Sequence, residues 1–236
     1  MTKEMEERLN RANTLREEEK YGESSKLYTE CLLELTGLND AEGLIHALGG
    51  QSLIYKHHIG KTPTSIYENL CLAFAYEGFR VAEDNKNKLS GYVLAIAYRC
   101  LGDALLMKDR PNEALIYFEQ AMQVSTADKC EKGNLKAHIG GIKYKLGEKE
   151  KGIEIIKEAL ADIRTGDMNS YAPRVWETGC LNKLAIADVL AGNKESALKC
   201  VNEAIQIEKE HNLTIRLKES EKILEKINKG ETNFVV

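Results

Sequence analysis

Proline and closely spaced cysteines are both scarce in this sequence, and each shortage excludes a class of protein. Only three of the 236 residues are proline, so long stretches are free to form helix. The six cysteines lie far apart and none belongs to a CxxC pair, which argues against a disulfide framework and against a zinc site. We expect them to be reduced and packed as small apolar side chains.

Long apolar runs and an excess of either charge are also missing. No stretch of 18 apolar residues occurs, so no membrane-spanning helix is expected, and the charged segment 1–10 does not resemble a secretory signal. The net charge is −4 and no block of Lys and Arg is present, which argues against nucleic acid as a partner. We therefore expect a cytoplasmic protein that binds neither membrane nor nucleic acid.

Motifs for catalysis, cofactors and metals do not occur either. HExxH, GxSxG and GxGxxG are absent. The Gly-Lys-Thr segment at 60–62 resembles the end of a phosphate-binding loop, but Tyr55 stands where that motif needs glycine. His57 and His58 point to different faces of a helix and His46 lies three turns away, so they do not form a metal site. The sequence predicts no enzyme activity, no cofactor and no metal.

Small and large side chains recur at matched intervals along the chain. Gly102 is followed by Ala114, Phe118 and Ala121, at offsets of 12, 16 and 19 residues. The same offsets relate Ala12, Ser24, Tyr28 and Cys31; Gly140, Gly152, Ile156 and Ala159; and Ala185, Ala197, Val201 and Ala204. Small residues let two antiparallel helices approach closely, and the large residue fills the space toward the next pair. The pattern predicts helical hairpins that stack in sequence order.

A fifth copy of the pattern is stretched. Gly49 stands at the first small position, and Ala75, Phe79 and Ala82 form the later triad, 26 residues rather than 12 further on. We expect both helices of this hairpin to be longer by about two turns and to meet at a turn over 60–63.

The segment that begins at Tyr98 resembles the tetratricopeptide-repeat (TPR) motif, with its Leu101-Gly102 pair and the triad Ala114, Phe118 and Ala121. The resemblance implies an all-α protein, a right-handed TPR-like α-solenoid of about 11 helices. We predict helices at 2–20, 23–37, 40–59, 64–84, 88–108, 111–125, 128–146, 149–165, 171–191, 194–211 and 214–228. They are expected to form one domain over 1–229, with hairpins at 2–37, 40–84, 88–125, 128–165 and 171–211, a cap at 214–228 and a flexible tail at 230–236.

Residues at the ends of the predicted helices support this division. Glycines suited to left-handed backbone fall in the predicted turns, at Gly22, Gly147 and Gly192. N-cap residues precede predicted helices, at Asp40, Asp109, Asp128 and Asn193. Pro111 lies in a first turn, where its missing N–H costs little.

The resemblance implies that the first helix of each hairpin lines a concave, partner-binding surface. The predicted contact residues are Asn10, Asn13, His46, Arg99, Asp103, His138, Tyr144, Asn182 and Lys183. Gly50 and Gly141 also fall at inner positions, and the pair Gly140-Gly141 would leave room for a ligand to approach the backbone. Asparagine can bond both polar groups of an extended peptide, and Arg99 and Lys183 can bind a carboxylate. Of the five positions that match the carboxylate clamp of chaperone-binding TPR proteins, Leu9, Asn13, Ala47, Ile96 and Cys100, only Asn13 fits.

These features favour a non-catalytic scaffold that binds a peptide or a partner protein in a concave groove. Two alternatives stay open. The chain could be a peptide-gated regulator that acts through a separate effector, or a self-assembling structural module such as a homodimer. An enzyme is the least favoured reading, since fold resemblance alone indicates no chemistry.

Overall fold

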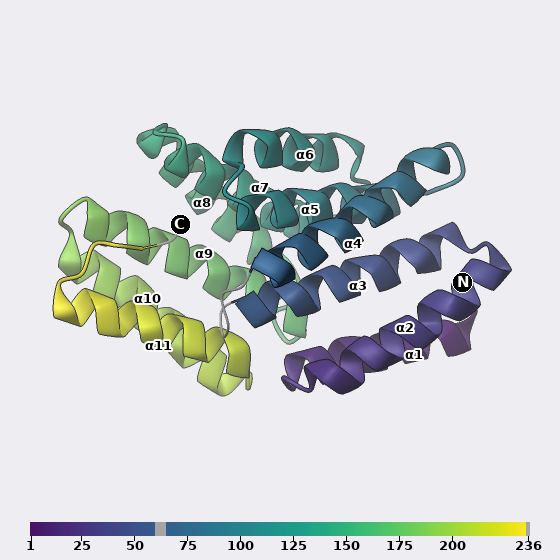
Figure 1. Ribbon diagram of the computed structural model, residues 1–236. Coiled ribbons are helices and arrows are strands. Elements are labelled where there is room, and N and C mark those ends of the chain that lie inside the picture. Colours follow the sequence, from purple (N-terminus) through teal and green to yellow (C-terminus); the bar gives the residue numbers. More distant parts are fainter. Residues whose placement is uncertain (60–64, 235–236) are drawn as a thin grey trace. The chain divides into compact units, whose positions relative to one another are not determined.

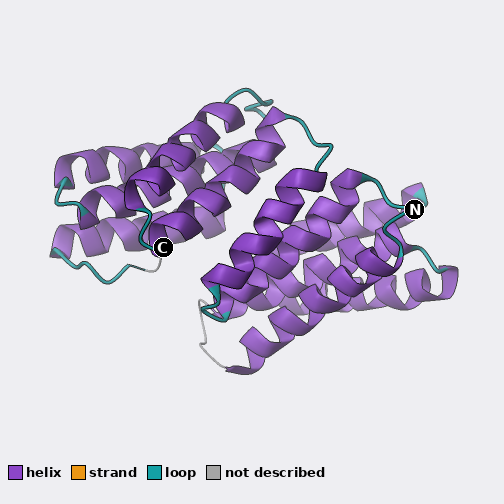
Figure 2. Ribbon diagram, turned by 90° about the horizontal axis from the view of Figure 1, so that it is seen from above, coloured by secondary structure: helices purple, strands orange, loops and turns teal. Residues whose placement is uncertain are grey.

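The computed structural model describes residues 1–59 and 65–234, and within them eleven helices follow one another (Figure 1). Figure 2 shows helices and their connections, without a strand, in this described part. The helices are α1 (Lys3–Glu17), α2 (Tyr21–Leu38), α3 (Ala41–Ile59), α4 (Ser65–Asp84), α5 (Gly91–Met107), α6 (Pro111–Val124), α7 (Lys129–Lys145), α8 (Lys149–Ile163), α9 (Tyr171–Leu190), α10 (Lys194–Glu210) and α11 (Thr214–Lys229). The all-α prediction is confirmed, and each predicted boundary lies within three residues of the observed one.

Left-handed residues end the first helix of most hairpins at one repeated position, two residues beyond the last helical residue. Gly147 and Gly192 occupy this position with φ of 97° and 85°, as predicted. Glu19 and Asp109 occupy it after α1 and α5, with φ of 60° and 54°. The predictions for Gly22 and Asp109 were therefore wrong, because Gly22 lies inside α2 and Asp109 is the left-handed residue rather than the N-cap.

The predicted N-caps are confirmed where an aspartate precedes a helix directly. Asp40 accepts a hydrogen bond of 3.0 Å from the Gly43 amide, and Asp128 accepts one of 2.9 Å from the Glu131 amide. Asn193 stands at the cap position of α10 but makes no side-chain cap bond. Pro111 is the first residue of α6, where its fixed φ suits the helix.

Close helix contacts occur at the small residues of the repeat. A Cβ on Gly102 would lie 2.7 Å from the Phe118 ring, and one on Gly140 would lie 2.9 Å from the Gly152 carbonyl oxygen. Ala114, Phe118 and Ala121 are fully buried. The residues at the repeat offsets are therefore those at which the two helices of a hairpin contact each other.

The stretched hairpin keeps this kind of contact. The Ser52 hydroxyl donates to the Cys71 carbonyl at 2.9 Å, and a Cβ on Gly78 would lie 3.5 Å from Leu48 Cβ. These pairs show that α3 and α4 pack against each other as antiparallel partners, as expected for one hairpin. The predicted turn at 60–63 lies outside the described residues.

Contacts divide the chain into two compact units, Met1–Thr126 and Ala127–Val236. In unit 1, α3 contacts both α1 and α5, so these three helices form one layer, with α2 and α4 packed against it and α6 paired with α5. In unit 2, α9 contacts α7 and α11, while α8 pairs with α7 and α10 pairs with α9. The single domain over 1–229 stays a prediction.

The last described residues contact α11 in unit 2. Lys226 Nζ donates to the Asn233 carbonyl at 3.0 Å and lies 5.6 Å above the centre of the Phe234 ring. Phe234 also packs against the apolar cluster that includes Val201 and Ile227. The part of the tail that is described is thus attached to the terminal helix.

Neither a membrane-spanning helix nor a group of metal ligands is found in the described residues. No described helix is long and apolar enough to cross a bilayer. No three His, Cys, Asp or Glu side chains in the described part of the chain are grouped so that they could hold a metal ion. All six cysteines are free thiols, and all except Cys200 are buried, in agreement with the predicted packing role.

Candidate partner-binding surface

Five of the predicted contact residues belong to the layer formed by α1, α3 and α5 in unit 1. Asn10 is exposed on α1, and its carbonyl oxygen accepts a bond of 3.0 Å from the Thr14 hydroxyl. Asn13, His46 and Arg99 are half-buried, whereas Asp103 is buried. All five residues therefore lie on helices of one layer, but they are exposed to different degrees.

Asn13 is held in place by a tyrosine that reaches across from α2. The Tyr28 hydroxyl donates to Asn13 Oδ1 at 2.6 Å, and Arg16 Nη1 donates to the same oxygen at 3.0 Å. The Tyr28 ring passes over Gly50, where a Cβ would overlap it. Burial raises the pKa of Tyr28 to about 12, so the phenol stays protonated and remains a donor.

The amide group of Asn13 is left available by this arrangement. Its oxygen serves Tyr28 and Arg16, while in the described part of the chain its nitrogen makes no hydrogen bond. A fixed side-chain amide with two free N–H donors can bond the carbonyl oxygens of an extended peptide. Gly50 leaves the space that the Tyr28 ring occupies, and so allows Tyr28 to reach Asn13.

Two cations converge on one buried carboxylate in the same layer. Lys56 Nζ lies 2.9 Å from Asp103 Oδ1, and Arg99 Nη1 lies 3.6 Å from Asp103 Oδ2. The Asp103 side chain is 5% exposed, whereas those of Lys56 and Arg99 are 29% and 25% exposed. The three groups carry one more positive than negative charge. Both partly exposed cations pair with the same buried carboxylate, that of Asp103.

His46 lies on α3 within the electrostatic reach of this cluster. Burial lowers the pKa of His46; the nearby Arg99 charge acts in the same direction, while the carboxylate of Glu42 opposes both. The imidazole is therefore neutral near pH 7, and it can donate from one nitrogen and accept at the other.

The other predicted contact residues lie in unit 2, and two of them are buried. Tyr144 is buried, and its Cβ would lie 2.8 Å from a Cβ on Gly152. Asn182 is buried beneath α11, where its amide donates to the Ser220 hydroxyl at 2.8 Å. Both side chains therefore contact other helices of the same unit.

The remaining two predicted contact residues, His138 and Lys183, are half-buried, and the side chain of Lys183 fills the space beside Gly141. His138 and Lys183 are partly exposed on α7 and α9. A Cβ on Gly141 would lie 3.2 Å from Lys183 Cε, so the stem of Lys183 occupies the space that the sequence had assigned to a ligand. Within unit 2, Lys183 is the predicted residue best placed to present a charge.

Comparison with known proteins identifies the fold. No protein-family model matches the sequence, and no curated protein is similar to it. The structure is similar to the crystal structure of BtubC (BKLC) from P. vanneervenii, with a TM-score of 0.61 and 16% sequence identity. The match covers 85% of this chain and 78% of that chain. The fold is TPR-like. At this identity the similarity concerns the fold alone, and the eleven described helices agree with it by packing in order as antiparallel hairpins.

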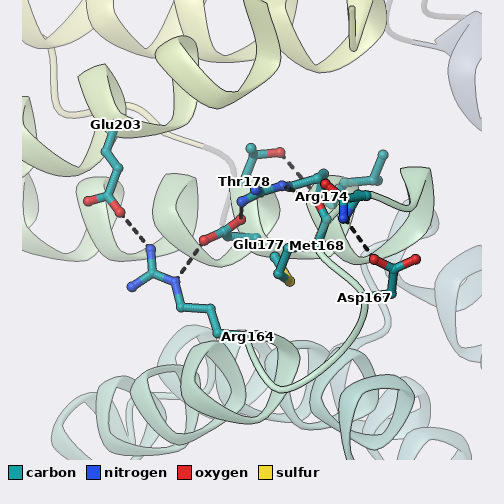
Figure 3. A network of polar contacts seen from close by, with 9 residues as sticks. Arg164, Asp167, Met168, Arg174, Glu177, Thr178 and Glu203 are labelled. Atoms are coloured by element: carbon teal, nitrogen blue, oxygen red, sulfur yellow. Dashed lines mark hydrogen bonds and ion pairs between the residues drawn. The ribbon is translucent and has the colours of Figure 1, made fainter. Parts of the chain in front are cut away.

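A charged network in unit 2 was not predicted from the sequence (Figure 3). Glu177 of α9 is 4% exposed and accepts from Arg164 Nε at 2.7 Å and from Arg174 Nη1 at 2.8 Å. Arg164 also reaches Glu203 of α10 at 2.5 Å, and Arg174 Nε donates to the Met168 carbonyl at 2.7 Å. The network ties the connection between α8 and α9 to both α9 and α10.

Only one pair of this network leaves a signal in the sequence. Arg174 and Glu177 are three residues apart on one helix, where such pairs commonly meet. Arg164 and Glu203 are 39 residues apart, so nothing local predicts that they touch. Both arginines are occupied by the chain itself, and we assign the network to stability rather than to partner binding.

Proposed function

We propose that this protein is a non-catalytic scaffold that binds a peptide or a partner protein on the surface formed by α1, α3 and α5. The observation that carries the proposal is the pair of partly exposed cations, Lys56 and Arg99, fixed on the buried carboxylate of Asp103. Side chains that are already ordered lose little conformational entropy on binding, and this favours recognition.

The chemistry of this surface favours an extended segment that carries a carboxylate. Arg99 can form a charge-assisted bond to a carboxylate, which is stronger than a bond between neutral groups. The Asn13 amide can bond a peptide carbonyl, and His46 can donate or accept at neutral pH. The TPR-like fold agrees with a protein partner, because stacked hairpins present long surfaces of this kind.

Arg99→Gln tests the proposal most directly. Asp103 keeps Lys56 as its partner in this variant, so the fold is expected to survive while one cation is lost from the surface. A partner recovered by co-purification with the tagged wild-type protein would be titrated against wild type and variant by isothermal calorimetry. Loss of a charge-assisted contact is expected to weaken binding by about tenfold or more.

Arg80→Gln is the matched control. Arg80 lies exposed on α4, where it pairs with Glu77 and Asp84, outside the layer of α1, α3 and α5. Its replacement is expected to leave partner binding unchanged. Lys183→Gln extends the test to unit 2. If Arg99→Gln binds the partner as tightly as wild type, the assignment of the surface of α1, α3 and α5 is wrong, whatever the result for Lys183→Gln.

A further inference from the structure

An aromatic hollow lies in unit 1 against α4, α5 and α6, on residues that the proposed binding surface does not use. Its volume is about 340 Å³, which is enough for one large side chain. Its walls include Phe79, Tyr98 and Tyr117, and the carboxylates of Glu83 and Glu113 line it as well. Ile116, which is 53% exposed, also borders the hollow and adds apolar surface.

The three rings form one connected group. Phe79 meets Tyr117 edge-on, with ring centres 5.3 Å apart and planes at 77°, and it meets Tyr98 at 5.7 Å and 47°. Rings in such tilted arrangements stabilise one another and hold fixed orientations. The hollow therefore has walls with defined faces, and the electron-rich face of a ring attracts a cation.

The chain already places a cation over one of these rings. Lys86 Nζ lies 5.8 Å above the centre of the Tyr98 ring and 3.4 Å from Glu83. The Tyr98 hydroxyl donates to Glu83, which fixes this carboxylate beside the ring. Burial, together with the bond to Glu83, raises the pKa of Tyr98, so the phenol keeps its proton and this geometry.

Lys86 itself is held only weakly. Its side chain is 50% exposed, and Glu83 is 39% exposed. Ion pairs between solvent-exposed groups of this kind contribute little, so another cation can replace the ammonium of Lys86 at small cost.

We propose that the hollow binds one cationic side chain, a lysine or an arginine, presented by a protein partner. The guest cation takes the position over Tyr98 and beside Glu83 that Lys86 now holds, and its aliphatic stem lies along Phe79 and Ile116. The lining supports a basic rather than an acidic guest, because Glu83 lies beside the Tyr98 ring and the guest takes over the cation that pairs with it, Lys86. Glu113 is already paired with Arg110 at 2.5 Å and adds little to this preference. This site is separate from the surface of α1, α3 and α5 in its position and in the charge that it selects.

The test compares two small probes with the same stem. N-acetyl-lysine amide carries the ammonium group, and N-acetyl-norleucine amide replaces it with a terminal methyl group. Each is titrated into the full chain, and the ring signals of Tyr98 and Tyr117 are followed by aromatic carbon–proton NMR. We expect saturable shifts with the lysine probe and an affinity about threefold or more above that of the norleucine probe.

Three variants decide between a cation site and a general apolar patch. Lys86→Ala removes the built-in competitor and is expected to tighten binding of the lysine probe by about two- to fivefold. Glu83→Gln keeps an acceptor for Tyr98 but removes the charge, so it is expected to weaken binding of the lysine probe and not of the norleucine probe. Lys88→Ala, at an exposed lysine two residues from Lys86, is the control and should change nothing.

Two results would overturn the proposal. One is equal binding of the two probes, which would show an apolar patch that does not recognise charge. The other is a Lys86→Ala variant that binds the lysine probe no more tightly than wild type. Melting curves that match wild type would show that such a result does not come from loss of the fold.

Discussion

The Ser220 hydroxyl donates a hydrogen bond of 2.8 Å to Glu208 Oε1, and this bond joins α11 to α10 inside unit 2. Both side chains are fully buried. Asn182 of α9 donates to the same hydroxyl, so three helices meet at one polar point. Glu208 Oε2 is buried as well and makes no hydrogen bond within the described residues. A buried carboxylate with an unsatisfied oxygen favours its protonated form.

Protonation of Glu208 is expected to make the stability of unit 2 depend on pH. Burial raises the pKa of Glu208 from 4.5 to about 7; Ser220, Thr178 and Arg216 oppose this rise, and Glu219 adds to it. The folded state therefore holds the proton more tightly than the unfolded state does. The stabilisation is fully present below pH 4.5 and is lost as the pH rises through about 7. The loss approaches about 3 kcal/mol in the free energy of unfolding.

Glu208→Gln is expected to flatten this pH dependence, because the amide stays neutral at every pH. Urea unfolding followed by the fluorescence of Trp176, which lies on α9, gives the free energy of unfolding between pH 5 and pH 8. Glu210→Gln, at an exposed residue near the end of the same helix, is the control and should retain the wild-type slope. A wild-type protein whose stability is unchanged over this pH range would contradict the assignment of Glu208.

Gly50→Ala is expected to destabilise unit 1 by about 1–3 kcal/mol. The added Cβ would overlap the Tyr28 ring, and the ring cannot move aside freely because its hydroxyl is bonded to Asn13. Gly37→Ala is the matched control, since a Cβ placed there would have no atom within 4 Å apart from its chain neighbours and its own helix backbone. It should be neutral or stabilising by up to about 1 kcal/mol. Thermal unfolding followed by circular dichroism measures both, and equal melting temperatures for the two variants would contradict the packing described for Tyr28.

Glu177→Gln is expected to lower the free energy of unfolding by about 2 kcal/mol or more, because it removes the charge of a carboxylate that is only 4% exposed and pairs with both Arg164 and Arg174. Glu203→Gln removes the other partner of Arg164. Glu203 is 41% exposed, so its replacement is expected to cost no more than about 0.5 kcal/mol. Both substitutions remove a carboxylate that pairs with Arg164, but Glu177 is buried whereas Glu203 is exposed. Equal losses in urea unfolding would show that burial of Glu177 is not what gives this network its strength.

Local patterns predicted the helices and the contacts inside each hairpin, because both depend on short distances along the chain. The offset from Gly102 to Phe118 is read directly from the sequence, and the structure places the two in contact. Turn residues were less predictable. Glu19 and Asp109 adopt left-handed backbone at the position where Gly147 and Gly192 do so, although residues other than glycine rarely adopt it.

Side-chain exposure on the predicted surface could not be obtained from the repeat alone. Asn182 has a polar side chain at an inner position, but α11 covers it and Ser220 bonds it. The repeat gives the position of a residue within a hairpin, whereas its exposure depends on which other helix covers it; here the covering residue, Ser220 of α11, is 38 residues away. The aromatic hollow was missed for the same reason, since Phe79, Tyr98 and Tyr117 come from three different helices.

Cys200 is expected to be the only thiol that reacts quickly in the folded protein. The other five cysteines are buried, and burial raises the pKa of Cys71 and of Cys180 to about 11, which keeps them protonated and unreactive. Burial also raises the pKa of Cys200, but its side chain is only partly covered. A thiol-reactive chromogenic disulfide should therefore label one site in a fast phase, with the rest slower by about 100-fold or more, since they react only after local or global opening.

Cys200→Ser should abolish the fast phase, and in concentrated guanidinium chloride all six wild-type thiols should react together. Two or more fast thiols in the native protein would show that the cores around the buried cysteines open more readily than their packing implies.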